Sequence, residues 1–164
     1  MKPFTPKTPH VNPDRRYYVD GFTFVKMDDN VERGQQEARN LHHFRGVWFA
    51  PQPKTAAVKD GRHVLGMDLV RGETLENLQA ALTPVERHNV AYQLLKIVAW
   101  MLDNGLVHGD LNESNVLFDR VRGHVFLVDF EMARKSHEMD GADLDGSGPY
   151  GLQHLLRYLY APKA

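Results

Sequence analysis

The chain has 164 residues, of which 42% are hydrophobic and 25% are charged, a balance typical of one soluble globular domain. Its 20 Lys and Arg against 21 Asp and Glu give a net charge of −1, so no overall basic charge indicates a nucleic-acid or membrane-surface partner. The absence of cysteine excludes disulfides, thiolate nucleophiles and zinc sites that need sulfur. No apolar run approaches the ~20 residues of a membrane span and no secretory signal is recognisable at the start, so we expect a cytoplasmic domain.

The first part of the chain predicts a small sheet and one helix. Residues 1–14 contain Pro at 3, 6, 9 and 13 and are expected to form a flexible or extended lead-in. The β-rich residues 16–27 surround Asp20-Gly21, which is a strong hairpin signal. Asn30 is a suitable N-cap for a helix that runs to about His43.

The next elements also follow from local patterns. Residues 47–50 predict a strand that stops at Pro51, and Asp60-Gly61 marks a second hairpin. Thr83-Pro84-Val85-Glu86 is a capping box that starts a long helix ending at Asn104-Gly105. Short apolar runs around Gly123 indicate a third hairpin, and residues 150–160 have helical spacing. Strands before helices favour an α+β fold.

Three polar residues after the long helix form the pattern that carries chemistry. Asp110 and Asn115 have the spacing D-x-x-x-x-N, and Asp129 ends the apolar run before Phe130. Phosphoryl transfer needs a carboxylate that orients the acceptor hydroxyl and oxygen ligands that hold Mg²⁺ against the phosphates. A loop acid, an asparagine and an acid at a strand end can supply these functions.

This arrangement resembles the protein-kinase-like superfamily. The sequence H-G-D-x-x-x-x-N is similar to the kinase catalytic loop, with Gly109 where protein kinases usually carry Arg. The run before Asp129-Phe130 resembles the strand leading into the magnesium-binding D-F-G motif, with Glu131 in place of Gly. The H-G-D form also resembles aminoglycoside and choline phosphotransferases, lipopolysaccharide kinases and small atypical kinases.

Upstream residues follow the order of the same superfamily. The resemblance implies that Lys26 binds the ATP phosphates and that Glu37 pairs with this lysine. It further implies a hinge in which Met67 is the gatekeeper, while Asp68 and Val70 contact adenine through main-chain atoms. Without the order of these motifs, Lys26 would be interpreted as a solvated strand-end lysine and Glu37 as a surface acid.

The resulting interpretation is a reduced protein-kinase-like fold with a small N-terminal antiparallel sheet, one helix and a truncated helical C-lobe. After the lead-in, residues 15–164 are expected to form one kinase-like domain. This domain would comprise an N-lobe at about 15–68, a hinge at about 67–72 and a reduced C-lobe at about 73–164.

The function implied by the resemblance is transfer of the γ-phosphate of ATP, with Mg²⁺, to a hydroxyl of a protein Ser/Thr or of a small molecule. Asp110 would orient or deprotonate the acceptor, Asn115 and Asp129 would hold the metal, and Lys26 paired to Glu37 would hold the phosphates. Glu131 brings a further carboxylate that either assists the metal or faces solvent, and it is expected to make its segment stiff because Glu cannot adopt φ > 0 cheaply.

The departures from the kinase pattern keep alternatives open. No glycine-rich phosphate loop precedes Gly21, no A-P-E sequence follows, and only residues 132–164 come after Glu131. A minimal kinase, a kinase completed by a protein partner, and a pseudokinase that binds nucleotide without turnover all fit the sequence. His108 is expected to be structural, and the acidic residues Glu138, Asp140, Asp143 and Asp145 to lie in a solvated loop.

Overall fold

A computed structural model describes residues 1–4, 13–138 and 149–160 of the chain. The chain divides into two compact units, Met1–Val70 and Arg71–Ala164, and each is described by itself. Among the described residues, no helix combines the length and the apolarity that a bilayer crossing needs. Three of the four expected loop acids, Asp140, Asp143 and Asp145, lie outside the described residues.

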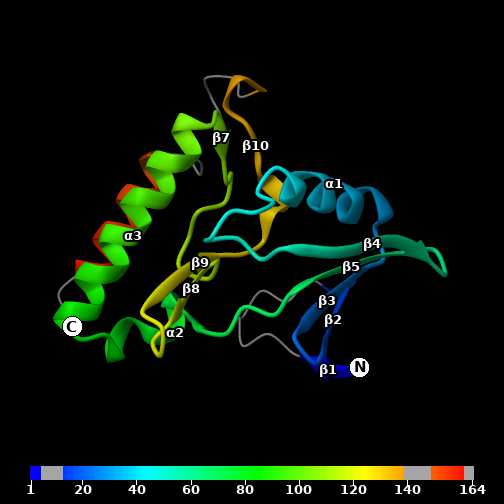
Figure 1. Ribbon diagram of the computed structural model, residues 1–164, viewed down its shortest axis with the longest axis horizontal. Helices are drawn as coiled ribbons and strands as arrows, with labels where there is room; N and C mark the ends of the chain where they lie inside the picture. The colour runs from blue at the N-terminus through cyan, green and yellow to red at the C-terminus, as the bar shows by residue number, and fades with distance from the viewer. Residues whose placement is uncertain (5–12, 139–148, 161–164) are drawn as a thin grey trace. The chain divides into compact units, whose positions relative to one another are not determined.

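The first unit is a five-stranded antiparallel sheet in the order β1-β2-β3-β5-β4, with one helix packed on it (Figure 1). Its elements are β1 (Lys2–Phe4), β2 (Arg15–Asp20), β3 (Thr23–Asp28), α1 (Val31–His42), β4 (Pro53–Lys59) and β5 (Arg62–Asp68). Both predicted hairpins are present. Asp60 and Gly61 form the second turn with φ of 51° and 74°, as a type I′ turn requires. In the first hairpin Asp20 pairs with Thr23, so the turn residues are Gly21 and Phe22, one position later than expected.

In the lead-in, Lys2–Phe4 pairs with β2 as an edge strand, which is the extended one of the two expected forms. One sequence-based expectation in this unit was wrong. Residues 47–50 form turns and not a strand. Their apolar character has a different cause, since Phe49 is fully buried against Phe44, with ring centroids 6.2 Å apart in an edge-on arrangement.

Helix α1 lies close to the sheet because a glycine faces it. The Asn30 side chain accepts a hydrogen bond from the Arg33 N–H, which confirms the predicted N-cap. A Cβ on Gly34 would lie 2.6 Å from the Cβ of His63 on β5, so only glycine permits this approach. The short distance places the following turns of α1, including Glu37, against β3 and β5.

The second unit is built on the long helix α3 (Pro84–Asp103), whose predicted capping box between Thr83 and Glu86 is present. The hairpin of β8 (Val116–Asp119) and β9 (His124–Leu127) packs against this helix, and the side chains of Asn89 and Gln93 donate to the Gly123 carbonyl at 3.0 and 2.7 Å. Helix α4 (Pro149–Tyr160), predicted from the sequence, runs along α3 (Figure 1).

Short elements complete the second unit. They are β6 (Glu73–Thr74), α2 (Leu75–Leu78), η1 (Gln79–Ala81), β7 (Leu106–Val107), η2 (Phe130–Met132), β10 (Arg134–Lys135) and η3 (Ser136–Glu138). Strand β6 joins β8 and β9 in one sheet, and β7 pairs with β10 in another. These elements were not predicted, because two-residue strands form only where a distant partner is brought to them.

Candidate active site

Lys26 and Glu37 form a buried ion pair within the first unit. Lys26 lies on β3 and Glu37 on α1, and the Lys26 Nζ is 2.7 Å from Glu37 Oε2 and 2.9 Å from Oε1. The two residues are only 5% and 3% exposed. Burial of either charge without the other is very costly, so neither residue is the solvated surface group of the alternative interpretation.

Sequence reasoning missed the carboxylate that fixes the start of α1. Asp28, at the end of β3, is 1% exposed and accepts hydrogen bonds from Arg15 Nε at 2.9 Å, from Arg33 Nε at 2.8 Å and from the Asn30 N–H at 2.8 Å. Burial raises the pKa of this carboxyl, but the hydrogen bonds from Arg33 and Arg15 outweigh it and lower the pKa to about 2. The sequence did contain a signal, since Asp28 ends a β-rich run just as Asp129 ends the apolar run before Phe130.

The expected hinge residues lie at the end of β5 and just after it. Met67 is buried at 7% exposure. The main-chain N–H of Asp68 donates to the Gln52 carbonyl at 2.9 Å, which leaves only its carbonyl for contact with adenine. The main-chain groups of Val70 make no hydrogen bond within the described part of the chain, so they are open to a ligand.

In the second unit the structure brings Asp110 and Asn115 together. Asn115 Nδ2 donates to Asp110 Oδ2 at 2.8 Å, and Asn112 Nδ2 donates to Asp110 Oδ1, also at 2.8 Å. Both oxygens of this exposed carboxylate are therefore oriented by amides, and each keeps a lone pair for another donor. Asn112 also accepts from the Ser114 N–H at 3.0 Å, which holds the loop in a tight turn.

Asp129 has a backbone conformation that few residues other than glycine adopt, with φ 63° and ψ 71°. Aspartate tolerates this left-handed region better than most residues. Asp60 adopts it in a hairpin turn, whereas away from such turns non-glycine residues in it cluster at functional sites. At Glu131, where D-F-G has glycine, the expectation was a stiff segment, because Glu cannot adopt φ > 0 cheaply. Glu131 lies in the 3₁₀ helix η2, outside the residues with positive φ.

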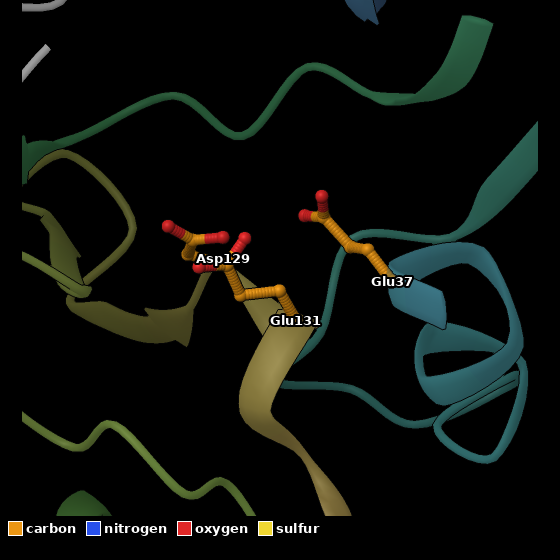
Figure 2. Close-up of side chains that lie close together, drawn as sticks. All are labelled: Glu37, Asp129 and Glu131. Carbon is orange, nitrogen blue, oxygen red and sulfur yellow. The ribbon is translucent and has the colours of Figure 1, made fainter. Parts of the chain in front are cut away.

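The side chains of Asp129 and Glu131 lie close together. Carboxylate oxygens of the two residues are within 4.8 Å of one another, and both side chains are half-buried. Figure 2 shows them on the segment after β9, and it also shows the side chain of Glu37 on α1.

These residues fit a divalent cation by the chemistry of their donors. Mg²⁺ prefers carboxylate and amide oxygens. Asp129 and Glu131 supply carboxylates. The side-chain amide of Asn115 donates through Nδ2 to Asp110, and its Oδ1 accepts no hydrogen bond among the described residues.

His108 and Gly109 join the loop to the segment that holds Asp129. His108 Nε2 donates to the Val128 carbonyl at 3.0 Å, and its ring packs edge-on against Phe130 at 4.9 Å. Burial lowers the pKa of this imidazole, which favours its neutral form. These contacts confirm the expected structural role of His108. Gly109 has φ 81°, and a Cβ there would overlap the Met132 carbonyl group, 2.8 Å from its carbon.

The two units together match one known family and one known fold. The profile of the RIO domain family matches residues 15–144. The fold is that of protein kinases: the chain resembles the kinase of Cydia pomonella granulovirus with a TM-score of 0.64 at 17% identity, covering 82% of this chain and 54% of that one. A crystal structure of WbdD is similar with a TM-score of 0.62 at 22% identity, over 75% of this chain and 31% of that one.

Two relatives share more of the sequence. The KEOPS complex subunit Bud32 of Pyrococcus abyssi is 30% identical over 115 residues, which are 69% of this chain and 51% of that protein. The O-antigen chain terminator bifunctional methyltransferase/kinase WbdD of Escherichia coli is 28% identical over 131 residues, or 71% of this chain and 18% of that protein. The chain thus spans about half of the first relative and less than a fifth of the second. With 15–144 matched, the chain belongs to the RIO domain family.

The first prediction concerns Gly109. Gly109→Ala adds a Cβ that overlaps Met132 in addition to the left-handed strain, so we expect a loss of more than about 2 kcal/mol of unfolding free energy. Gly105→Ala is the matched control, because Gly105 has φ 64° but its nearest neighbour atom is 3.6 Å from an added Cβ; strain there costs about 1 kcal/mol. Urea unfolding measures both, and equal losses would contradict the close contact.

The second prediction concerns pH and His108. Because burial depresses the pKa of His108 below its usual 6.5, the unfolded chain takes up this proton first as the pH falls. The contribution of neutral, buried His108 to the free energy of unfolding is therefore complete above about pH 6.5, and it decreases as the pH falls below that value. We expect His108→Gln to make the free energy of unfolding less dependent on pH between about 7.5 and 5. The exposed His42 provides the control, since His42→Gln should keep the wild-type slope.

Proposed function

We propose that this chain is an ATP- and Mg²⁺-dependent phosphotransferase that moves the γ-phosphate to a hydroxyl group. The observation that carries the proposal is that the two ends of the Asn115 side-chain amide serve different groups. Its Nδ2 orients the Asp110 carboxylate, and its Oδ1 is left for a ligand. The buried Lys26–Glu37 pair and the membership in the RIO domain family support the same activity.

In the proposed reaction Asp110 acts on the acceptor. Its carboxylate accepts a hydrogen bond from the attacking hydroxyl and orients one oxygen lone pair toward the γ-phosphorus. As the new O–P bond forms, the bond to the β-phosphate oxygen breaks, ADP leaves and the hydroxyl proton passes to Asp110. Because Asn112 and Asn115 hold both carboxylate oxygens, positioning contributes more here than basicity.

The remaining residues would bind the nucleotide and the cation. Lys26 would bind phosphate oxygens, with Glu37 keeping its ammonium in place, and Met67, Asp68 and Val70 would contact adenine. Asn115 and Asp129 would hold Mg²⁺, and Glu131 is close enough to Asp129 to assist. When bound, the cation supplies charge neutralisation on the phosphate oxygens.

The acceptor is proposed as a class only, a protein Ser/Thr or a small-molecule hydroxyl. Bud32 is by name a subunit of the KEOPS complex, and this supports a protein partner for this chain. A cytoplasmic location, where ATP is plentiful, belongs to the same proposal, as does the arrangement of one domain over 15–164.

The pseudokinase alternative rests on a specific observation. No glycine occurs among residues 1–20, so the sequence before the β2–β3 hairpin lacks the glycines of the loop that covers the phosphates in protein kinases. Such a chain would bind nucleotide without transferring phosphate.

The third prediction tests turnover. With γ-labelled ATP, Mg²⁺ and a panel of hydroxyl acceptors including the protein itself, we expect transfer by the wild type and at least about 100-fold less by Asp110→Asn. Asp103→Asn, an exposed acid at the end of α3, should leave the rate unchanged. Nucleotide binding without transfer to any acceptor would favour the pseudokinase.

The fourth prediction tests the ion pair. Lys26→Met should weaken nucleotide handling strongly and Glu37→Gln less so, because removal of either partner takes this ion pair from the buried charge that remains. A double-mutant cycle in activity should show coupling between the two positions. Lys59→Met, at an exposed position at the end of β4, is the matched control. Strictly additive effects would contradict a functional pair.

A further inference from the structure

Helix α3 is apolar on two sides, and only one of them is used within the second unit. The side packed into the core includes Val90, Leu94, Ile97 and Met101. The opposite side carries a second row of side chains, all of them exposed: Val85, His88, Tyr92, Leu95, Ala99 and Leu102. We call this row the α3 seam.

The spacing of the α3 seam is that of a helix–helix interface. Successive members are separated by three and four residues in strict alternation, which keeps a stripe on one face of a helix that packs against another helix. The large members are well exposed, with 79% for Val85, 57% for Tyr92, 49% for Leu95 and 52% for Leu102. Scattered apolar residues on a surface need no explanation, but a contiguous periodic row indicates an interaction site.

We propose that the α3 seam is the interface of a homodimer, in which α3 of a second copy packs against it in antiparallel orientation about a twofold axis. In this orientation three kinds of layer form, each occurring twice: Val85 with the partner's Leu102, His88 with the partner's Ala99, and Tyr92 with the partner's Leu95. The seam is thus complementary to itself, as an interface between identical chains must be.

The sizes of the side chains favour the antiparallel orientation. It places the large His88 opposite the small Ala99, so that the layers have similar volumes. A parallel pair in register would stack His88 on His88 and Ala99 on Ala99, which crowds one layer and leaves a gap in another. Antiparallel helices also have opposed dipoles, which is electrostatically favourable.

The flank and the area of the α3 seam are consistent with this partner. Lys96 lies beside the seam with its Nζ 5.5 Å from the centroid of the Tyr92 ring, and the antiparallel arrangement places it opposite Asn89, so like charges do not meet.

The seam is about 26 Å long at 1.5 Å per residue. Two copies together would bury about 1,000 Å², the lower end for a specific interface, so we expect a dimer of modest affinity.

The fifth prediction is therefore a concentration-dependent dimer in solution. Sedimentation equilibrium of the full chain should show a monomer–dimer equilibrium, and Leu95→Glu should weaken it at least about 100-fold, because each dimer would bury two such carboxylates. Val121→Glu is the matched control, since Val121 is 97% exposed on the β8–β9 turn and lies off the seam. The dimer dissociation constant of this variant should equal that of the wild type. Circular dichroism checks that each variant is folded.

The orientation can be tested separately because the chain contains no cysteine. Tyr92→Cys mixed with Leu95→Cys under mild oxidation should give a disulfide between the two variants in preference to either homodimer, since these positions face each other. A predominant link between two Tyr92→Cys chains would overturn the antiparallel arrangement. A wild-type chain that stays monomeric up to about 1 mM, a concentration that detects even the weakest specific association, would overturn the interface.

Discussion

The second unit depends on a backbone contact between the loop after α3 and the segment after β9. His108 donates to the Val128 carbonyl, and the Val128 N–H donates to the Asn115 carbonyl at 3.0 Å. Gly109 lies directly against the Met132 carbonyl group, where no side chain fits. This contact sets the positions of the loop acid and of Asp129 at once. It also explains why glycine stands where protein kinases usually carry arginine, since a larger residue would push the two segments apart.

The first unit depends in the same way on a buried charge. Asp28 accepts hydrogen bonds from Arg15 on β2 and from Arg33 on α1, and so it joins two strands and the helix at one point. A carboxylate in such a place is stable only while its partners remain. With the start of α1 fixed and Gly34 allowing close approach to β5, Glu37 reaches Lys26 from the next turns of the helix. The position of the pair proposed to hold phosphates thus depends on the hydrogen bonds of Asp28 at the start of α1.

The segment from Asp129 to Glu131 differs from the D-F-G pattern because Glu131 replaces the glycine. In the D-F-G pattern the glycine provides backbone freedom after the metal ligand. Here Asp129 itself adopts the left-handed conformation, and Glu131 enters a 3₁₀ turn with ordinary backbone angles. The left-handed conformation is therefore found at the residue proposed to bind the cation. The carboxylate of Glu131 is thereby brought near that of Asp129, which the sequence pattern did not require.

What the sequence by itself determined is local: the two hairpins of the first unit, the capped helices α1 and α3, and the spacing of Asp110 and Asn115. Turn geometry and helix capping depend on residues two to four positions apart, so they can be predicted from neighbouring residues in the sequence. The order of the motifs also implied one distant contact, that of Lys26 with Glu37. Only the tertiary structure decided the other distant contacts. The apolar side chain of Phe49 suggested a strand, but Phe49 lies in a turn and its side chain is buried in the core. The strands β7 and β10, and the partners of Asp28, depend on residues far away in the chain, and no local pattern records which of them will meet when the core packs.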